Sequence, residues 1–468
     1  MIFSAALQPF LQRRPGALDL IEIEPQTLWM ADDPFHGPYF EFGLGIDLIE
    51  ALPGRKLVHS VGMPLGGTRV PDPAQCALLR ATAERLDSPW VSEHLAVGGT
   101  PHRASGFFLP PLQTEEGVAI AAANIRAFSE AVGRPVAIET GVSYIARKPF
   151  EMMDGAFVAR IVEECGCGIL LDLHNIYCNE RNGRCSMDDF LADIPLENVW
   201  EVHLAGGMEM DGYWLDSHSG PMPDDLRARS LEIVRHLPNL GALNFEIYDS
   251  FMNDLDLATY DRITDDLREI WACAGTACDD APPGPSPEPA SARTADKPSP
   301  RDWEDRLTRA VWKDSTAGHP WPEDADPLKL YAKLARSFRG SMLARALPRT
   351  IRYLLLRDGP AASAMLQRYF NDVSPLLYAP LEARAFVDWL GPERRNDALL
   401  AGLSDYDLAL VAILRENEPH TVVFPGNPAP VFEALAQARL PEPPEPPEWE
   451  LEILPDADVN TAFNPAPS

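Results

Sequence analysis

The chain has 468 residues, with 70 Asp and Glu against 40 Lys and Arg, so its formal net charge is −30. An acidic excess of this size repels phosphate backbones and argues against a general nucleic-acid-binding protein. No uncharged apolar run reaches the roughly 18 residues that span a membrane, and residues 1–16 lack the order of a signal peptide. Seven cysteines do not suggest a secreted disulfide framework. We therefore expect a cytoplasmic protein without nucleic-acid or membrane partners.

Proline marks the main boundary of the chain. The 46 prolines are about twice the usual share of roughly 5%, and seven of them lie between Asp279 and Pro300. Such a composition predicts an extended linker. A second Pro/Glu run occupies 441–448. The predicted division is a barrel-sized region at 1–276, a linker at 277–302, a smaller region at 303–455 and a loose tail at 456–468.

The first region alternates β-rich apolar runs with helical patterns. The predicted strands are 18–24, 56–62, 89–97, 135–140, 167–173, 198–205 and 243–248, and helical patterns between them include 73–86, 115–132, 150–164 and 223–237. This alternation is typical of βαβ units and a parallel sheet. Seven strands in about 250 residues, with room for an eighth, favour a TIM-like (β/α)8 barrel. An open doubly wound sheet is the alternative, but its GxGxxG motif is absent after the first strand.

Histidines, acidic residues and one asparagine lie at or just after the ends of the predicted strands. They are His59, Glu93, His94, Glu139, Asp172, His174, Asn175, His203, Asp216, His218 and Glu246. In a barrel these ends meet at one mouth. A single histidine on a strand is more often a hydrogen-bonded core residue, but several buried charges together require pairing or a metal. Nitrogen and oxygen ligands without thiolate suit iron, manganese or zinc, and their number predicts two or three ions with bridging carboxylates.

Six motifs in the first region resemble the DUF692 family. They are VSEHLAVGG (91–99), AIET (137–140), LLDLHNIY (170–177), EVHLAGG (201–207), DSHSGP (216–221) and NFEIYDS (244–250). The resemblance spans about residues 5–270 and keeps the family's order of motifs. These proteins are multinuclear non-haem iron-dependent oxidative enzymes (MNIO) that modify ribosomally synthesised peptides. The resemblance implies a TIM-like barrel with two or three irons of mixed Fe(II)/Fe(III) state. It also implies O₂ as co-substrate and a precursor peptide as substrate, often modified at cysteine.

The resemblance also implies a ligand set. Carried onto this chain, the iron ligands are His59, His94, Glu139, Asp172, Asn175, His203, Asp216, His218 and Glu246. Glu139 is the expected bridging carboxylate and, with His174 and His102, a predicted catalytic residue. Position 174 is commonly Asn in the family, and a strand that continued to residue 174 would point His174 to the mouth beside Asp172. His102 is a substrate-side candidate in the loop after the third strand. The chain also departs from the family at 25–27, where Pro-Gln-Thr replaces Pro-Glu-Asn.

The cysteines do not form a zinc ribbon. Cys165 and Cys167, Cys178 and Cys185, and Cys273 and Cys278 lack its two-pair spacing. We interpret Cys165 and Cys167 as core residues. A Cys178–Cys185 bridge remains an alternative that a reducing cytosol disfavours.

The second region reads as mainly helical, with no cluster of metal ligands. Its predicted helices are 303–313, 327–347, 361–370, 381–390 and 406–415, followed by strand-like segments at 421–424 and 450–454. Seven basic residues gather at 333–357. They form either a solvated face that balances the acidic barrel or a groove for an acidic peptide. The resemblance implies a separate peptide-presenting partner protein, and this region is predicted to replace that partner in cis.

The sequence therefore predicts an O₂-dependent iron enzyme acting on a ribosomal precursor peptide, which the second region binds. Two alternatives remain open. One is a zinc- or manganese-dependent barrel enzyme of the isomerase or endonuclease type. The other is a metal-binding regulator or scaffold without turnover. Metal analysis and O₂ dependence distinguish these three classes.

Overall fold

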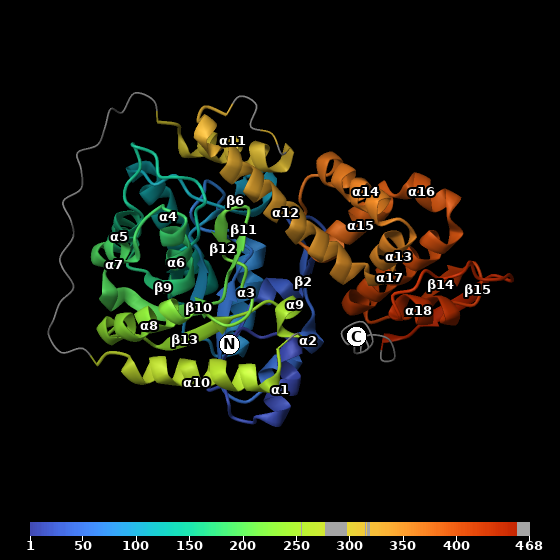
Figure 1. Ribbon diagram of the computed structural model, residues 1–468, viewed down its shortest axis with the longest axis horizontal. Coiled ribbons are helices and arrows are strands. Elements are labelled where there is room, and N and C mark those ends of the chain that lie inside the picture. The colour runs from blue at the N-terminus through green and yellow to red at the C-terminus, as the bar shows by residue number, and fades with distance from the viewer. Residues whose placement is uncertain (254, 277–296, 314, 316–318, 456–468) are drawn as a thin grey trace.

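The computed structural model describes residues 1–253, 255–276, 297–313, 315 and 319–455. Its centre is a seven-stranded parallel sheet in the order β1-β4-β5-β8-β9-β10-β13 (Figure 1). The strands are β1 (Leu20–Ile23), β4 (Arg55–Ser60), β5 (Val91–His94), β8 (Val136–Glu139), β9 (Gly168–Asp172), β10 (Val199–Ala205) and β13 (Ala242–Glu246). Each overlaps a predicted strand. The sheet curls into a TIM-like barrel, which confirms the predicted fold class.

The first residues of the chain occupy the gap between β13 and β1. Ile2 forms a parallel bridge with Glu22, and its N–H donates to the Phe245 carbonyl at 3.3 Å. On the β1 side, the Phe3 N–H donates to the Glu22 carbonyl at 2.7 Å. A short bridging segment thus takes the place of the expected eighth strand and satisfies backbone groups on the two edges. The doubly wound alternative, which leaves these edges apart, is wrong.

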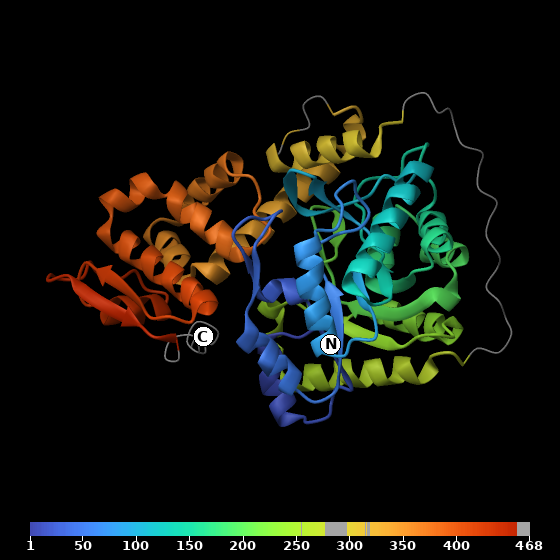
Figure 2. The ribbon, with the colours of Figure 1, turned by 180° about the vertical axis from the view of Figure 1, so that it is seen from behind.

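Helices surround the strands (Figures 1 and 2). They are α1 (Gln8–Arg13), α2 (Gly43–Ala51), α3 (Pro73–Arg85), α4 (Glu115–Val132), α5 (Asp154–Cys165), α6 (Leu173–Arg181), α7 (Met187–Asp193), α8 (Asp224–Ile233), α9 (Asp249–Met252) and α10 (Leu257–Cys273). Local sequence fixes their ends. Thr114 accepts from the Gly117 N–H to begin α4, and Gly133 ends it with a φ of 67°. None of the described helices is long and apolar enough to cross a membrane.

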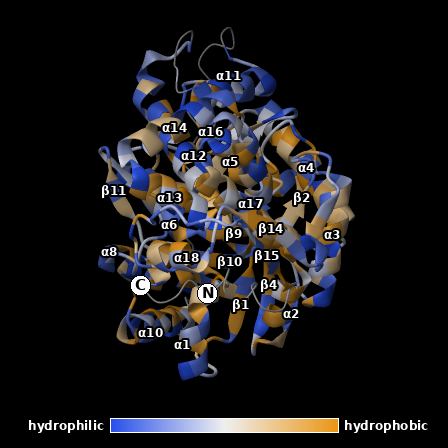
Figure 3. Cartoon of the chain, turned by 90° about the vertical axis from the view of Figure 1, so that its right-hand side faces the viewer, coloured by the Kyte–Doolittle hydropathy of each residue, from blue (hydrophilic) through white to orange (hydrophobic). Residues whose placement is uncertain are grey.

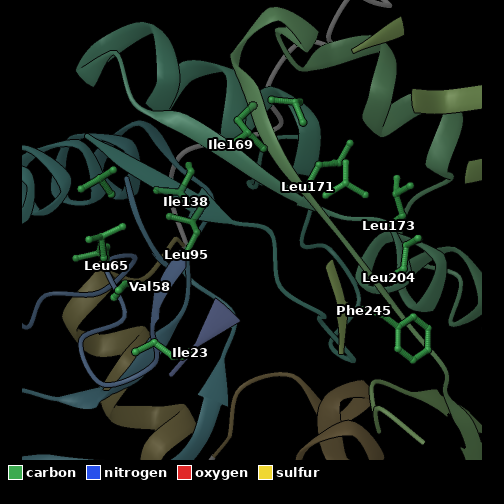
Figure 4. Packing of buried hydrophobic residues seen from close by; sticks show 14 of the residues in the cluster. Ile23, Val58, Leu65, Leu95, Ile138, Ile169, Leu171, Leu173, Leu204 and Phe245 are labelled. Atoms are coloured by element: carbon green, nitrogen blue, oxygen red, sulfur yellow. The ribbon is translucent and has the colours of Figure 1, made fainter. Parts of the chain in front are cut away.

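Apolar residues between the strands and their helices form the barrel core. Figure 4 shows Ile23, Val58, Ile138, Leu171 and Phe245 among its members, all buried. Strand β1, with three apolar residues of four, is coloured largely hydrophobic in Figure 3. Three antiparallel hairpins extend from the barrel: β2 (Trp29–Ala31) with β3 (Tyr39–Glu41), β6 (Val97–Thr100) with β7 (Arg103–Leu109), and β11 (Met208–Met210) with β12 (Tyr213–Leu215).

The C-terminal region is mainly helical, as predicted. It contains α11 (Pro300–Lys313), α12 (Ala325–Ala346), α13 (Pro348–Arg357), α14 (Gly359–Asp372), α15 (Ala379–Trp389), α16 (Gly391–Asn396), α17 (Ala398–Glu416), β14 (His420–Phe424), α18 (Ala429–Ala436) and β15 (Trp449–Ile453). The end of α12, helices α13, α14, α15, α17 and α18, and the antiparallel pair β14–β15 share an apolar core of their own, with Tyr369 and Phe386 at 0% exposure. The predicted tail at 456–468 lies outside the described residues.

A third apolar cluster joins α11 and α12 to the barrel. It brings Trp303 and Tyr331 against residues of the β6–β7 hairpin and of the loop after β8. Polar contacts reinforce it: the Trp303 indole donates to the Pro110 carbonyl at 3.0 Å, and Lys148 Nζ lies 2.7 Å from Asp324 Oδ1 with both groups buried. Of the predicted linker, 277–296 lie outside the described residues, and 300–302 are the first turn of α11.

Candidate metal centre

Seven of the nine predicted ligands come together at the carboxyl ends of the strands. They are His59, His94, Glu139, Asp172, His203, His218 and Glu246. The parallel register causes this convergence: His94 pairs with Glu139 across β5 and β8, and Asp172 pairs with His203 across β9 and β10. Side chains that face the interior at the same end of neighbouring strands meet at one mouth.

These seven side chains form three overlapping groups. The groups are His59–His94–Glu139, Glu139–Asp172–His203 and Asp172–His218–Glu246, and within each group one ligand atom per residue lies within 4.8 Å of the others. Glu139 belongs to the first two groups, and Asp172 belongs to the last two. Two shared carboxylates linking three groups is the arrangement expected of a multinuclear centre with bridging carboxylates.

Imidazole nitrogens and carboxylate oxygens face one another within these groups. Nε2 of His59 and Nε2 of His94 both face Glu139 Oε2, at 3.2 and 3.1 Å. Nδ1 of His203 and Nε2 of His218 face the two oxygens of Glu246, at 2.9 and 3.1 Å. The donor set is nitrogen and oxygen without sulfur, which suits iron, manganese or zinc.

Several buried ligand atoms have no hydrogen-bond partner. They are Glu139 Oε2, Asp172 Oδ2, Asn175 Oδ1, His203 Nδ1, His203 Nε2 and His218 Nε2. Buried polar atoms are ordinarily hydrogen-bonded because desolvation without a partner is costly. Four of these six atoms lie at ion-pair distance from another ionisable side chain without forming a hydrogen bond. That all six belong to predicted ligands supports the fit of these residues to bound metal ions.

The imidazoles and carboxylates of the site strongly shift one another's pKa values. Burial lowers the pKa of His59, but Glu139 opposite its Nε2 outweighs this effect and raises the pKa to about 10. The pKa of His218 likewise rises to about 10 because Asp216 and Glu246 outweigh burial. Burial and the neighbouring carboxylates raise the pKa of Asp172 well above its usual value. Such clustered shifts are typical of functional sites.

The remaining two predicted ligands lie beside the groups rather than within them. Asp216 Oδ1 is 2.8 Å from His218 Nε2, so Asp216 adjoins the third group. Asn175 donates to Glu139 Oε1 at 3.2 Å and to the Thr140 carbonyl at 3.1 Å. His218 adopts a φ of 45°. A non-glycine residue in this left-handed region is uncommon, and such strain is often found at functional sites.

His174 reaches the site by a different route from the predicted one. Strand β9 ends at Asp172, whose carboxylate accepts from the Asn175 N–H at 2.8 Å and caps α6. The expectation that a continuing strand would carry His174 was therefore wrong. His174 lies in the first turn of α6, fully buried, with Nδ1 3.1 Å from Asp216 Oδ1. Gly207 makes room for it, since a Cβ there would lie 2.6 Å from His174 Nε2.

The structure does not bring His102 into the metal groups. It lies exposed in the turn between β6 and β7. Its predicted substrate-side role stays a prediction. The described cysteines, including Cys178 and Cys185, are all free, so the alternative of a Cys178–Cys185 bridge is wrong. The Cys278 partner considered for Cys273 lies outside the described residues.

A layer of buried polar residues beneath the ligands was not predicted. His203 Nε2 lies 3.0 Å from Glu22 Oε2 and 3.4 Å from Glu201 Oε1. Asn244 donates to the same two oxygens at 3.0 Å each, and Trp90 Nε1 donates to Glu201 at 2.9 Å. Burial and Glu201 raise the pKa of Glu22 to about 7. The available signal was the period-two alternation, which puts Glu201 on the same face of β10 as His203.

The outer side of the site carries two aromatic rings and one free carboxylate. Phe108 lies 4.3 Å from the His94 ring and Tyr248 lies 4.8 Å from the His218 ring, measured between centroids. Glu24 continues β1 with extended backbone. Among the described residues its carboxylate has no ion-pair or hydrogen-bond partner, and burial raises its pKa. Sequence reasoning missed Glu24 because the quoted motifs begin later in the chain.

The fold and this donor set define an α/β barrel protein with candidate metal-binding side chains clustered at its mouth. Residues 45–248 match the family described as RiPP precursor modification enzyme MbnB/TglH/ChrH. A UPF0276 protein of Chromobacterium violaceum is 34% identical over 229 residues, covering 48% of this chain and 82% of that protein. One of Caulobacter vibrioides is 32% identical over 233 residues, covering 48% and 80%. The chain belongs to this family of enzymes, which confirms the predicted family.

Solved structures match part of the chain at low sequence identity and low TM-score. A D-psicose 3-epimerase of Clostridium cellulolyticum H10 has a TM-score of 0.39 and 12% identity, over 58% of this chain and 96% of that chain. The IOLI protein with a bound zinc atom has a TM-score of 0.36 and 13% identity, over 57% and 90%.

Proposed function

We propose that the protein is an O₂-dependent multinuclear iron enzyme that oxidatively modifies a residue of a ribosomally synthesised precursor peptide. The single observation that carries the proposal is the chain of three ligand groups that share Glu139 and Asp172. The family supports the substrate class, because its description names the modification of such precursors. Cysteine is the residue that the resemblance favours as the target, and the cytoplasm is the expected location.

The residues present would hold two or three irons. His59, His94 and Glu139 form the first binding group, and Asp172, His218 and Glu246 form the last, with Asp216 beside it. Iron bound there would supply the redox chemistry between O₂ and the peptide. We assign the bridging role to Glu139 because it belongs to two neighbouring ligand groups.

Other side chains orient the ligands or face the substrate. His174 fixes Asp216 through its Nδ1. Phe108 and Tyr248 shield the outermost imidazoles on two sides of the mouth, and Tyr248 is half exposed, so a peptide reaches it. Glu24 is proposed to accept a proton from a substrate group because the residue is half-buried near the ligands and its carboxylate forms no ion pair or hydrogen bond among the described residues. His102 extends this substrate-side surface along the hairpin.

The C-terminal region is proposed to bind the peptide, so no separate partner protein is needed. Two of its basic residues reach toward the mouth: Lys333 lies 2.8 Å from Asp211 in the β11–β12 turn, and Arg345 lies 3.6 Å from Asp249 in α9. Both pairs are exposed, and an acidic peptide segment would compete for these cations. Arg339 and Arg349 instead pair with buried acids inside the region, at Glu382 and Asp407. We therefore assign the contact with the acidic peptide to Lys333 and Arg345 of α12.

The test uses the full chain, loaded with iron, and the precursor peptide encoded beside its gene. We expect the peptide mass to change by a defined amount in air and to stay constant under nitrogen. Zinc-loaded protein is the matched control and should leave the peptide unchanged in air. A mass change that requires zinc or proceeds without O₂ would contradict the proposal.

A further inference from the structure

The loop that follows Glu139 is held from the C-terminal region. Residues 140–153 connect β8 to α5, so the loop begins directly after the predicted bridging carboxylate. Tyr331 of α12 is fully buried against it. The Tyr331 hydroxyl accepts from the Tyr144 N–H at 3.2 Å and donates to the Val142 carbonyl at 3.5 Å. One side chain from α12 thus satisfies two backbone groups of this loop.

Tyr144 connects Tyr331 to Asp216 and His218 on the opposite side of the site. Its hydroxyl accepts from the Asp216 N–H at 3.3 Å, and Asp216 Oδ1 lies 2.8 Å from His218 Nε2. The Tyr144 ring packs edge-on against Tyr331 and against Tyr213, at 5.3 and 5.9 Å between centroids. A continuous path of packed, hydrogen-bonded groups therefore runs from α12 to the last ligand group.

Charged groups fix the same loop independently. Lys148 is buried and lies 2.7 Å from Asp324, which directly precedes α12. His319 Nε2 lies 3.1 Å from the other oxygen of Asp324. Because buried ions are held only where their partners are in place, this pairing orients the start of α12 relative to the loop.

We propose that α12 is a structural part of the metal centre, in which Tyr331 and Tyr144 are positioning residues for Asp216 and His218. This inference rests on the proposed function, since it assumes that these ligands hold iron. It assigns the C-terminal region a second role: α12 sets the geometry of the outer binding group as well as contacting the peptide. Groups that orient metal ligands commonly change metal affinity by about 10- to 100-fold when removed.

The experiment measures Fe(II) stoichiometry and affinity of the full chain by competition with a chelator under nitrogen. Tyr144→Phe removes the acceptor of the Asp216 N–H and should weaken iron binding at the outer group, which contains His218, about 10-fold. Tyr331→Phe should weaken binding at the same group by a smaller factor and leave the other iron sites unchanged. Adding Tyr331→Phe to Tyr144→Phe should cause no further loss, because Tyr331 acts through Tyr144.

Tyr369→Phe is the matched control, because Tyr369 is equally buried and its hydroxyl donates to the Glu382 carbonyl within the C-terminal core. It should lower thermal stability to a similar extent and leave iron binding at the wild-type level. If both test variants bind iron like this control, or if their effects simply add, the inference is wrong while the proposed function stands. If the wild-type chain binds no iron, the proposed function is wrong and the inference fails with it.

Discussion

Glu139 is the residue on which the proposed centre depends most, since one of its oxygens faces His59 and His94 and the other accepts from Asn175. Glu139→Gln keeps the volume but replaces an anionic ligand oxygen by an amide. We expect the loss of at least one iron per chain and of activity, measured by elemental analysis and peptide mass. Glu382→Gln, which alters an equally buried acid far along the chain, should keep its iron. Unchanged iron in Glu139→Gln would show that the ligand assignment is wrong.

The perturbed imidazoles predict how metal binding depends on pH. With pKa values of about 10, His59 and His218 are protonated in the metal-free protein at pH 7.5. A metal binds neutral imidazole, so its uptake must release these protons, and Fe(II) affinity should rise as pH increases from about 6 toward 10. Calorimetric titration in buffers of different ionisation enthalpy counts the protons released. Uptake without proton release, or affinity that falls over this range, would contradict the electrostatic account.

His174 lies outside the three ligand groups and contacts Asp216. His174→Asn should therefore retain the iron but change the rate or the products, since Asp216 loses an imidazole partner. Iron analysis combined with mass spectrometry of the products measures both effects. If the variant has wild-type kinetics and products, His174 has a purely structural role and the prediction is wrong.

At the scale of elements, the predicted strands overlap the observed ones because each is a short apolar run, and most of them carry predicted ligands near their ends. Helix α4 has the predicted bounds because Thr114 and Gly133 mark both ends. The end of β9 was not predictable from periodicity, because LLDLHNIY is apolar on both sides of Asp172 and the cap depends on a side-chain contact. The hairpins β6–β7 and β11–β12 are too short to give a reliable alternation.

The docking of α11 gives a prediction at this scale. Trp303 is almost fully buried in the cluster that joins α11 to the barrel. Trp303→Ala should lower the free energy of unfolding by about 3–5 kcal/mol, because it leaves a large cavity and frees the Pro110 carbonyl. Thermal and denaturant unfolding measure the loss. Trp271→Ala, which changes an exposed tryptophan of α10, is the control, and equal stability of the two variants would contradict the observed packing.

At the scale of the whole molecule, the two regions share one interface rather than only a connecting segment. The sequence separates them at its proline-rich stretch, yet Trp303 and Tyr331 pack against the barrel loops. This could not be predicted, because contacts between residues hundreds of positions apart leave no local pattern. The same limit applies to Glu22 and Glu201, whose meeting beneath His203 depends on the closure of the barrel. The strand-end ligands were predictable because parallel strands bring their ends together whatever the loops do.

The most direct test of the multinuclear centre is anomalous X-ray diffraction at the iron edge from crystals of the iron-loaded full chain. We predict two or three iron peaks at the barrel mouth, with Glu139 between two of them and His218 beside the outermost. A single peak bound by His59, His94 and Glu139 alone, or iron located away from the strand ends, would contradict the account.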